Sequence, residues 1–206
     1  MEVILNNMPG DTIYSATTGR ATRELFFLRE KRGETKAHDF LNVGSMGHAS
    51  SVALGIALEK TERKVVALDG DSACMMHMGA MTMVSKLDAP NFMHVVLNNG
   101  SHESVGGQPS AGHKVDFTKI AEACDYATVG HPVTTEVELV EALEVLRDCG
   151  KASFIDCRIH KGLSRKLPPV IFDHREVIDA LIDDLNESRI IMDNKTKFRI
   201  NRKKGI

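Results

Sequence analysis

The sequence lacks the signals that assign a chain to the membrane, secreted or nucleic-acid-binding classes. No apolar run reaches the length of a membrane span, and the first residues do not form a signal peptide. The four cysteines show no CxxC spacing, which indicates free thiols in a reducing cytoplasm. The net charge of -2 does not indicate a nucleic-acid partner. We therefore expect a cytoplasmic protein that contacts neither a membrane nor nucleic acid.

Two common site motifs are also missing. No GxGxxG follows the first expected strand, which argues against a Rossmann-type nucleotide binder. The nine histidines form no HExxH or other metal-ligand spacing, so we expect most of them to be structural or solvated. The 206 residues show no internal repeat and suffice for one α/β domain with a hydrophobic core.

Short apolar runs alternate with helical patterns along the chain. After a possibly helical lead-in over 2–7, we expect strands over 12–16, 64–68, 93–97, 128–129 and 153–159, and helices over 21–31, 48–58, 75–87, 117–124, 135–147 and 174–186. This alternation predicts a three-layer α/β/α fold with a mainly parallel sheet. The helix over 75–87 carries five methionines, which we expect in the core.

The chain is predicted to hold one domain followed by an extension. Residues 1–167 form the α/β domain, and the pair Pro168-Pro169 marks a linker. Residues 168–193 contain that linker and the last helix, which packs on the domain or on a partner. Residues 194–206 form a basic tail, which we expect to be a solvated end of the chain.

Polar residues follow two neighbouring strands of the central part of the chain. Asp71 comes soon after the run that ends at Leu68, and Asn98-Asn99 follows the run that ends at Leu97. A crossover helix between two parallel strands brings both strand ends to the same edge of the sheet, where ligands of such sheets bind. A carboxylate and an amide at that edge form an oxygen-rich site, which suits Mg²⁺ bound together with phosphate.

These two segments resemble a known pair of motifs. Gly70-Asp71-Ser72 and Asn98-Asn99, with Asp71 and Asn99 separated by 28 positions, are similar to the GDG…NN motif of thiamine-diphosphate enzymes. Ser72 stands where the pattern has its last glycine, which departs from the strict motif but keeps the carboxylate. The resemblance implies a thiamine-diphosphate-binding fold with thiamine diphosphate and Mg²⁺ as cofactors.

The resemblance also assigns roles to single residues. It implies that Asp71, the side chain of Asn99 and the backbone carbonyl of Ser101 bind the metal. The backbone N–H groups of Ser72 and Ala73, which follow Gly70 at a helix N-terminus, would reach the diphosphate. Asn98 is expected to hold the turn.

Two further stretches match the same family. In Gly44-Ser45-Met46-Gly47, the resemblance places Met46 where an apolar side chain props the bent cofactor, and the Gly44 carbonyl where the 4′-amino group is held. Ordinary packing is the alternative for Met46. In Thr17-Thr18-Gly19-Arg20, it places Thr18 and Gly19 beside the diphosphate. The alternative here is a simple strand-to-helix turn.

The segment after Asn98-Asn99-Gly100 carries the most specific resemblance. Ser101 is followed by His-Glu-Ser-Val-Gly-Gly-Gln-Pro, which is similar to phosphonopyruvate decarboxylases, and the resemblance extends roughly from Thr12 to Ile159. It suggests that His102 contacts the substrate or an intermediate, with the Gly106-Gly107 amides near an anionic group. A solvated loop histidine is the alternative.

The resemblance implies a carbon–carbon lyase that converts phosphonopyruvate, a small anionic 2-oxoacid, to phosphonoacetaldehyde and CO₂. The alternatives are the β-type subunit of sulfopyruvate decarboxylase, or a non-catalytic subunit that retains the fold; a carboligase such as acetolactate synthase is more distant. Such enzymes need a glutamate from a pyrimidine-binding domain, and this chain holds only the diphosphate-binding half. We expect the missing pyrimidine-binding half on a separate subunit, or lost by truncation, so that the chain is active only in a hetero-oligomer.

Overall fold

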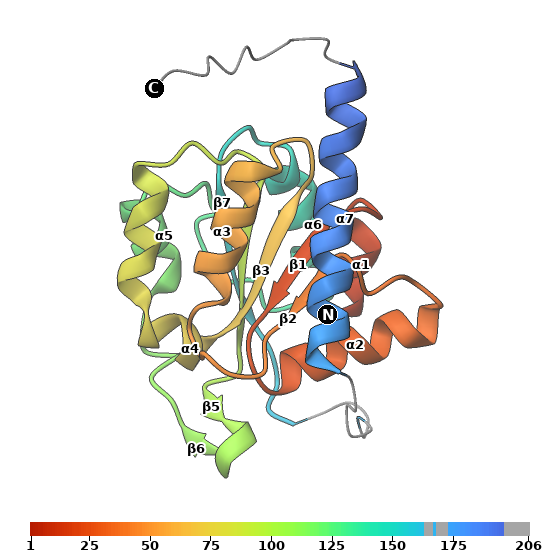
Figure 1. Ribbon diagram of the computed structural model, residues 1–206. Coiled ribbons are helices and arrows are strands. Elements are labelled where there is room, and N and C mark those ends of the chain that lie inside the picture. Colours follow the sequence, from red (N-terminus) through yellow and green to blue (C-terminus); the bar gives the residue numbers. More distant parts are fainter. Residues whose placement is uncertain (163–166, 168–172, 196–206) are drawn as a thin grey trace, which may run out of the picture.

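A parallel sheet forms the centre of the molecule (Figure 1). The computed structural model describes residues 1–162, 167 and 173–195. The five strands lie in the order β2-β1-β3-β4-β7, and every neighbouring pair is parallel. Their bounds are β1 Ile13–Ala16, β2 Asp39–Leu41, β3 Val65–Gly70, β4 Phe92–Asn98 and β7 Ser153–Arg158.

Helices cover both faces of the sheet, which confirms the predicted three-layer α/β/α architecture. One face carries α1 (Glu2–Asn7), α2 (Arg20–Arg32) and α6 (Glu136–Arg147). The other carries α3 (Ala49–Glu59), α4 (Asp71–Met76), the 3₁₀-helix η1 (Met78–Ser85), α5 (Phe117–Ala123) and α7 (His174–Lys195), which packs near β2. No helix in the described part of the chain is long and apolar enough to cross a membrane.

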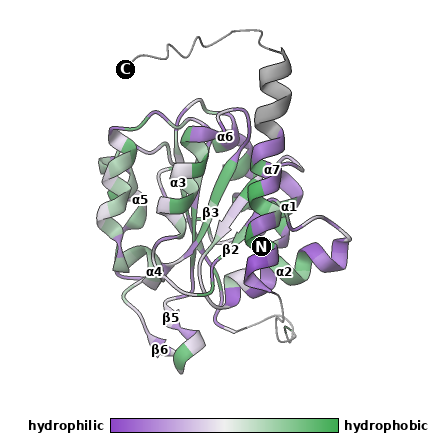
Figure 2. Cartoon of the chain, in the orientation of Figure 1, coloured by the Kyte–Doolittle hydropathy of each residue, from purple (hydrophilic) through white to green (hydrophobic). Residues whose placement is uncertain are grey.

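The strands bury both of their faces, as expected for a parallel sheet. In β3, Val66 and Leu68 contribute to the core beneath α2 and α6, while Val65 and Ala67 contribute to the core beneath α3. Figure 2 shows the hydropathy that produces this arrangement, with hydrophobic residues along β3 and hydrophilic residues on much of α7.

Local sequence signals define several helix ends. Asp116 caps α5, because its side chain accepts a hydrogen bond from the Lys119 backbone. Thr135 and Glu138 form a capping box at the start of α6. Gly33 ends α2 in the left-handed conformation, with a φ of 63°.

The prediction of one helix over 75–87 is wrong. Helix α4 begins at Asp71, directly where β3 ends, and it ends at Met76. His77 departs from helical geometry, with a φ of -130°, and η1 follows it. The prediction that the methionines of this segment lie in the core is wrong in part. Because the periodicity changes at His77, Met76 is 62% exposed and Met83 46% exposed, while Met81 is buried.

Other differences concern short or peripheral elements. The strand predicted over 128–129 is absent from the described residues, where isolated bridges join Ala127 to Ser153 and Val133 to Cys157. The sequence did not predict β2, which has only three residues. Helix α7 continues to Lys195, well past the predicted end. The Pro168-Pro169 linker and residues 196–206 of the basic tail lie outside the described residues.

The order of the strands fixes the position of the site. The chain passes from β1 to β2 on one side, whereas β3, β4 and β7 follow on the other side. The crevice between the carboxyl ends of β1 and β3 is therefore a switch point, where ligands of open α/β sheets bind. The hairpin of β5 (Ser101–His102) and β6 (Gln108–Pro109), with the 3₁₀-helix η2 (Glu103–Val105) between them, projects beyond this edge near α4 (Figure 1).

Candidate cofactor site

A pocket opens at this carboxyl edge, between the segments that follow β1, β3, β4 and β7. All of the predicted site residues line it except Gly19 and Gly44, which lie outside its lining. Those that line it are Thr18, Met46, Gly70, Asp71, Ser72, Ala73, Asn99, Ser101 and His102. The structure thus brings together residues from four separate segments of the sequence.

Asp71 is held in place by the loop that contains Ser110 and Gly112. The carboxylate is almost completely buried, and its Oδ2 accepts a hydrogen bond from the Ser110 hydroxyl. The Gly112 backbone N–H in turn donates to Ser110 Oγ over 3.1 Å. A Cβ built on Gly112 would lie 2.8 Å from Asp71 Cβ and closer still to its Oδ2. Residue 112 is therefore a position where only glycine permits the observed approach of Asp71.

Asn98 lies beneath Asp71 and faces the interior. Its Nδ2 donates to the Gly112 carbonyl over 2.9 Å and to Asp156 Oδ1 over 3.0 Å. Burial raises the pKa of the Asp156 carboxyl, and the hydrogen bond from Asn98 opposes this effect. Asn98 therefore has a structural role, but its side chain holds the loop containing Gly112 rather than the turn that the sequence predicted.

Asn99 faces the pocket, and both ends of its amide have partners. Its Oδ1 accepts a hydrogen bond from the Ser101 backbone N–H over 3.0 Å. Its Nδ2 donates to Glu103 Oε2 over 3.0 Å. The same oxygen of Glu103 accepts from Arg20 Nη1 over 2.8 Å, and Glu103 Oε1 accepts from the Gly162 backbone. These bonds fix the orientation of the Asn99 amide and join three segments of the pocket wall.

Met46 lies on the open side of the pocket. It lines the pocket but keeps 36% of its surface exposed. Its loop is strained at Ser45, which has a φ of 46°, while Gly47 adopts its φ of 85° without strain. Gly44 is exposed, and its N–H donates to Asn42 Oδ1 over 3.2 Å. This chain alone therefore leaves Gly44, Ser45 and Met46 facing solvent, whereas Gly47 is buried.

His102 ends β5 and lines the pocket in a half-buried position. The Gly106-Gly107 pair, which the sequence placed beside it, lies in the exposed part of the hairpin and does not line the pocket. The Gly107 backbone N–H donates to the His102 carbonyl over 3.0 Å. In this structure the glycines thus shape the hairpin that carries His102.

Negative charge dominates the lining of the pocket. Four acidic residues contribute to the lining, Glu24, Asp69, Asp71 and Glu103, and the guanidinium of Arg20 is the only Lys or Arg side chain among its described lining residues. Of the four, Asp69 is fully buried, with its Oδ2 at 3.4 Å from His94 Nε2. Such a site repels a bare anion and attracts a divalent cation. An anionic ligand is therefore expected to enter together with a metal ion.

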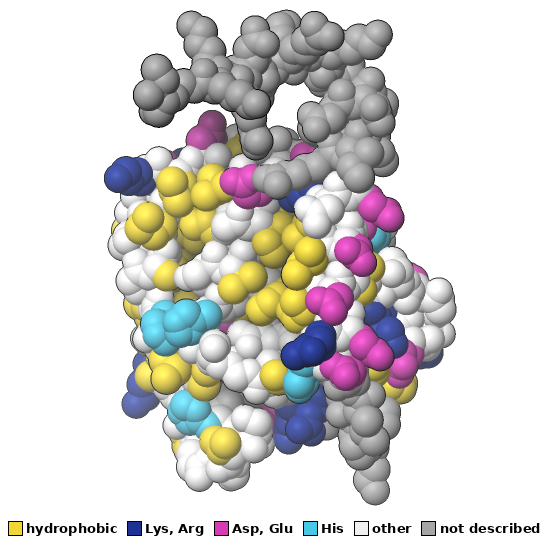
Figure 3. All heavy atoms as spheres, in the orientation of Figure 1, with side chains coloured by type: hydrophobic (Ala, Val, Ile, Leu, Met, Phe, Trp, Pro, Cys, Tyr) yellow, Lys and Arg dark blue, Asp and Glu magenta, His cyan; other side chains and the backbone are white. Residues whose placement is uncertain are grey.

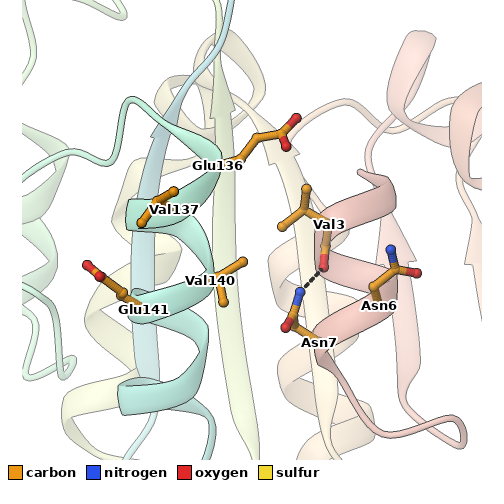
Figure 4. A pocket seen from close by; sticks show the side chains of 7 residues that line it. All are labelled: Val3, Asn6, Asn7, Glu136, Val137, Val140 and Glu141. Carbon is orange, nitrogen blue, oxygen red and sulfur yellow. Dashed lines mark hydrogen bonds between the residues drawn. The ribbon is translucent and has the colours of Figure 1, made fainter.

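A second hollow lies between α1 and α6 (Figure 4). It shares no residue with the pocket at the sheet edge. Val3, Val137 and Val140 form its apolar part, and Asn7 Nδ2 donates along its own helix to the Val3 carbonyl over 2.8 Å. Its described lining residues include no histidine or cysteine, and the two glutamates among them, Glu136 and Glu141, lie on the same helix.

The fold and this geometry agree with the comparisons. Residues 18–157 match the family described as thiamine pyrophosphate enzyme, C-terminal TPP binding domain, where thiamine pyrophosphate is another name for thiamine diphosphate. The match covers more than half of the 206 residues. The chain belongs to the thiamine pyrophosphate enzyme family. The predicted resemblance is thereby confirmed at the level of the family and the domain.

Individual relatives agree with this assignment. Phosphonopyruvate decarboxylase of Streptomyces viridochromogenes is 38% identical over 143 residues, which cover 69% of this chain and 34% of the relative. Sulfopyruvate decarboxylase subunit beta of Methanothermobacter thermautotrophicus is 31% identical over 175 residues, which cover 85% of this chain and 88% of that subunit. This chain therefore spans about a third of the phosphonopyruvate decarboxylase but most of the β subunit.

A solved structure supports the fold. The thiamine diphosphate-dependent 4-hydroxybenzoylformate decarboxylase of Rhodococcus jostii RHA1 aligns with a TM-score of 0.56 and 17% identity, over 77% of this chain and 31% of that chain. At this level of identity, the likeness extends to the architecture alone.

The sequence assigned no role to four residues that shape the pocket at the sheet edge: Arg20, Glu103, Ser110 and Gly112. Arg20 and Glu103 lie within recognised motifs, directly after Gly19 and His102, so their positions were a usable signal. Ser110 and Gly112 lie in a loop without any motif. Their contact with Asp71 depends on the path of the chain after the hairpin.

Proposed function

We propose that this chain is the diphosphate-binding subunit of a thiamine-diphosphate- and Mg²⁺-dependent decarboxylase, which converts phosphonopyruvate to phosphonoacetaldehyde and CO₂. The main support is the arrangement of a buried Asp71 and an oriented Asn99 at one sheet edge, from strands that adjoin each other. The higher identity to phosphonopyruvate decarboxylase than to the sulfopyruvate enzymes supports this substrate.

The residues of the pocket fit the cofactor and the metal. Asp71, Asn99 and the backbone carbonyl of Ser101 would supply oxygen ligands for Mg²⁺. Thr18 and Gly19, with the backbone of Ser72 and Ala73, would contact the diphosphate. When bound, thiamine diphosphate supplies the electron sink that decarboxylation requires.

The other residues orient the reacting groups. Met46, on the open side, would support the cofactor at its middle, and the Gly44 carbonyl would hold the amino group. His102 is placed at the pocket wall, where its ring could donate a hydrogen bond or a proton to the substrate. The free cysteines of the described structure are compatible with a reducing compartment such as the cytoplasm.

The proposal includes a second chain. The relatives from Methanothermobacter and two other methanogens are named as β subunits, which implies a partner subunit for those proteins. The exposed Met46 loop supports the same arrangement here, because a second chain would cover it. We propose a separate pyrimidine-binding subunit that contributes the catalytic glutamate and forms a hetero-oligomer with this chain.

Sulfopyruvate decarboxylase is the second candidate. Its support is the extent of the alignment, since this chain covers 88% of the Methanothermobacter β subunit. Phosphonate and sulfonate are similar oxyanions, so the choice depends on which substrate is turned over when both are offered at equal concentration.

The test measures binding and turnover separately. Calorimetric titration of this chain with thiamine diphosphate, with Mg²⁺ or with EDTA, should show metal-dependent binding that Asp71→Asn abolishes. The control is Glu136→Gln on α6, outside the pocket, which should bind normally. The chain combined with its partner should then decarboxylate phosphonopyruvate faster than sulfopyruvate. Unchanged binding by Asp71→Asn would refute the proposed site. Metal-dependent binding without turnover of either oxoacid would favour the non-catalytic alternative.

A further inference from the structure

Arg20 and Glu103 form an ion pair inside the pocket. Arg20 is the first residue of α2 and Glu103 the first residue of η2, and the two side chains meet at 2.8 Å although they are 83 positions apart. Glu103 is well buried, with 13% of its side chain exposed, while Arg20 keeps 37% exposed. The pair therefore occupies the wall of the pocket with the guanidinium on its more accessible side.

The two members of the pair differ in how firmly they are held. Glu103 also accepts hydrogen bonds from Asn99 Nδ2 and from the Gly162 backbone, so it has three partners. The Arg20 side chain, in contrast, has one polar partner among the described residues, which is Glu103. Glu103 can thus stay in place when Arg20 moves.

We propose that Arg20 is an oxyanion-binding residue of this pocket, and that it exchanges Glu103 for a phosphorus or sulfur oxyanion of the ligand. Glu103 remains bonded to Asn99 during this exchange and positions it. The inference rests on the proposed function and deepens it. Two ligand groups carry the required chemistry: the diphosphate end of the cofactor and the phosphonate or sulfonate end of the substrate.

The energetics favour this exchange. A partly exposed ion pair contributes little to stability, because solvent screens it. A guanidinium that meets a phosphate-like group can form two parallel charge-assisted hydrogen bonds, which are stronger than a single bond to a carboxylate oxygen. Arg20 is also the only Lys or Arg among the described lining residues, so no other such cation of the lining can replace it.

The experiment measures anion binding to the full chain with two probes. One probe is inorganic diphosphate with Mg²⁺, which represents the cofactor end, and the other is methylphosphonate, which represents the substrate end. We expect Arg20→Gln to lower the affinity for one of them by about tenfold or more, which is the effect of losing hydrogen bonds to a charged group. Arg20→Lys should recover part of it. Arg23→Gln, an exposed arginine on the same helix that does not line the pocket, should leave both affinities unchanged.

A double-mutant cycle separates the exchange from general electrostatics. Glu103→Gln removes the competing charge and keeps an oxygen that can accept from Asn99, so anion affinity should rise. If Arg20 receives the anion, this gain should disappear in the Arg20→Gln background. A gain of equal size in both backgrounds would overturn the inference, and so would a wild-type chain that binds neither probe.

The outcome for Asp71→Asn distinguishes the two proposals. If Asp71→Asn abolishes metal-dependent thiamine diphosphate binding while Arg20→Gln changes neither probe, only the role of Arg20 is refuted. If Asp71→Asn has no effect, the proposed function fails whatever Arg20 does. Circular dichroism of each variant confirms that the fold is retained.

Discussion

Replacing Gly112 by alanine should disrupt the site, although it substitutes no residue of the recognised motifs. A Cβ at this position would lie 2.6 Å from Asn98 Oδ1 and 2.8 Å from Asp71 Cβ, whereas ordinary contacts are 3.4–4 Å. The backbone of Gly112 is outside the left-handed region, so alanine can adopt its conformation. The effect of the substitution therefore comes from the contact alone.

The size of the effect follows from that contact. The loop must move away from both Asp71 and Asn98, or these side chains must move, which weakens the bonds from Ser110 to Asp71 and from Asn98 to the Gly112 carbonyl. Overpacking of this kind reduces the free energy of unfolding by about 1–3 kcal/mol. Displacing the carboxylate should also lower the affinity for Mn²⁺ or Mg²⁺ by about 10–100-fold, as changes beside metal ligands do.

Urea unfolding measures the change in stability. Calorimetric titration of the chain with the metal, in the presence of thiamine diphosphate, measures the change in metal affinity. The matched control is Gly55→Ala, an exposed position on α3 where a Cβ meets nothing within 4 Å. This control should be stabilising by about 0.5–1 kcal/mol, because alanine favours helix, and should bind the metal normally. Full stability together with full metal affinity in Gly112→Ala would refute the support that we assign to this loop.

Two further substitutions test the scaffold. Arg29→Met leaves Asp39 buried without the guanidinium that donates two hydrogen bonds of 3.0 Å to it, and should cost about 3–5 kcal/mol in urea unfolding. Burial raises the pKa of Asp39 to about 6, above its ordinary value, so its ionisation opposes folding. The decrease in the free energy of unfolding caused by Arg29→Met should hence become smaller as the pH falls below about 6 and larger above it. A decrease that does not depend on pH would contradict this. Thr135→Ala removes the cap of α6 and should cost about 1 kcal/mol, with metal affinity unchanged.

The candidate site at the edge of the sheet could be predicted from the sequence because it depends on local patterns. The runs that became β3 and β4 are apolar, and their polar ends fall at Asp71 and Asn99. Parallel pairing then places those ends side by side. Nothing beyond these two strands and their crossover is needed to bring the two side chains together.

The supporting contacts could not be predicted in the same way. Ser110 meets Asp71 across 39 positions, and Glu103 meets Arg20 across 83. Asp71, Glu103 and Arg20 are the first residues of α4, η2 and α2, and Ser110 lies in a loop, so apolar periodicity does not predict which residues their side chains meet. The errors near α4 have a similar cause, since the strand end at Gly70 starts the helix earlier than its apolar spacing indicates.

The outer side of helix α3 is exposed, which its apolar sequence alone does not predict. Helix α3 is apolar and rich in small residues, and its outer side remains exposed at Ser51, Gly55 and Leu58. Figure 3 shows hydrophobic side chains gathered over this face and acidic side chains along α7. A buried-helix pattern on a helix with one exposed side is typical of a surface that meets another chain.

The charge of the pocket agrees with the proposed need for both a metal and a second chain. The acidic residues of the lining outnumber its one described guanidinium and would repel the diphosphate of a cofactor that arrives alone. In the proposed function a divalent cation at Asp71 would reverse that repulsion, and the proposed exchange would free the charge of Arg20 for the ligand. These two changes can bind an anion, but they leave the Met46 loop exposed to water. Since electrostatic interactions in a catalytic site strengthen when water is excluded, we propose that the anchor formed by Asp71 and Asn99 becomes an effective active site only when another chain covers that side.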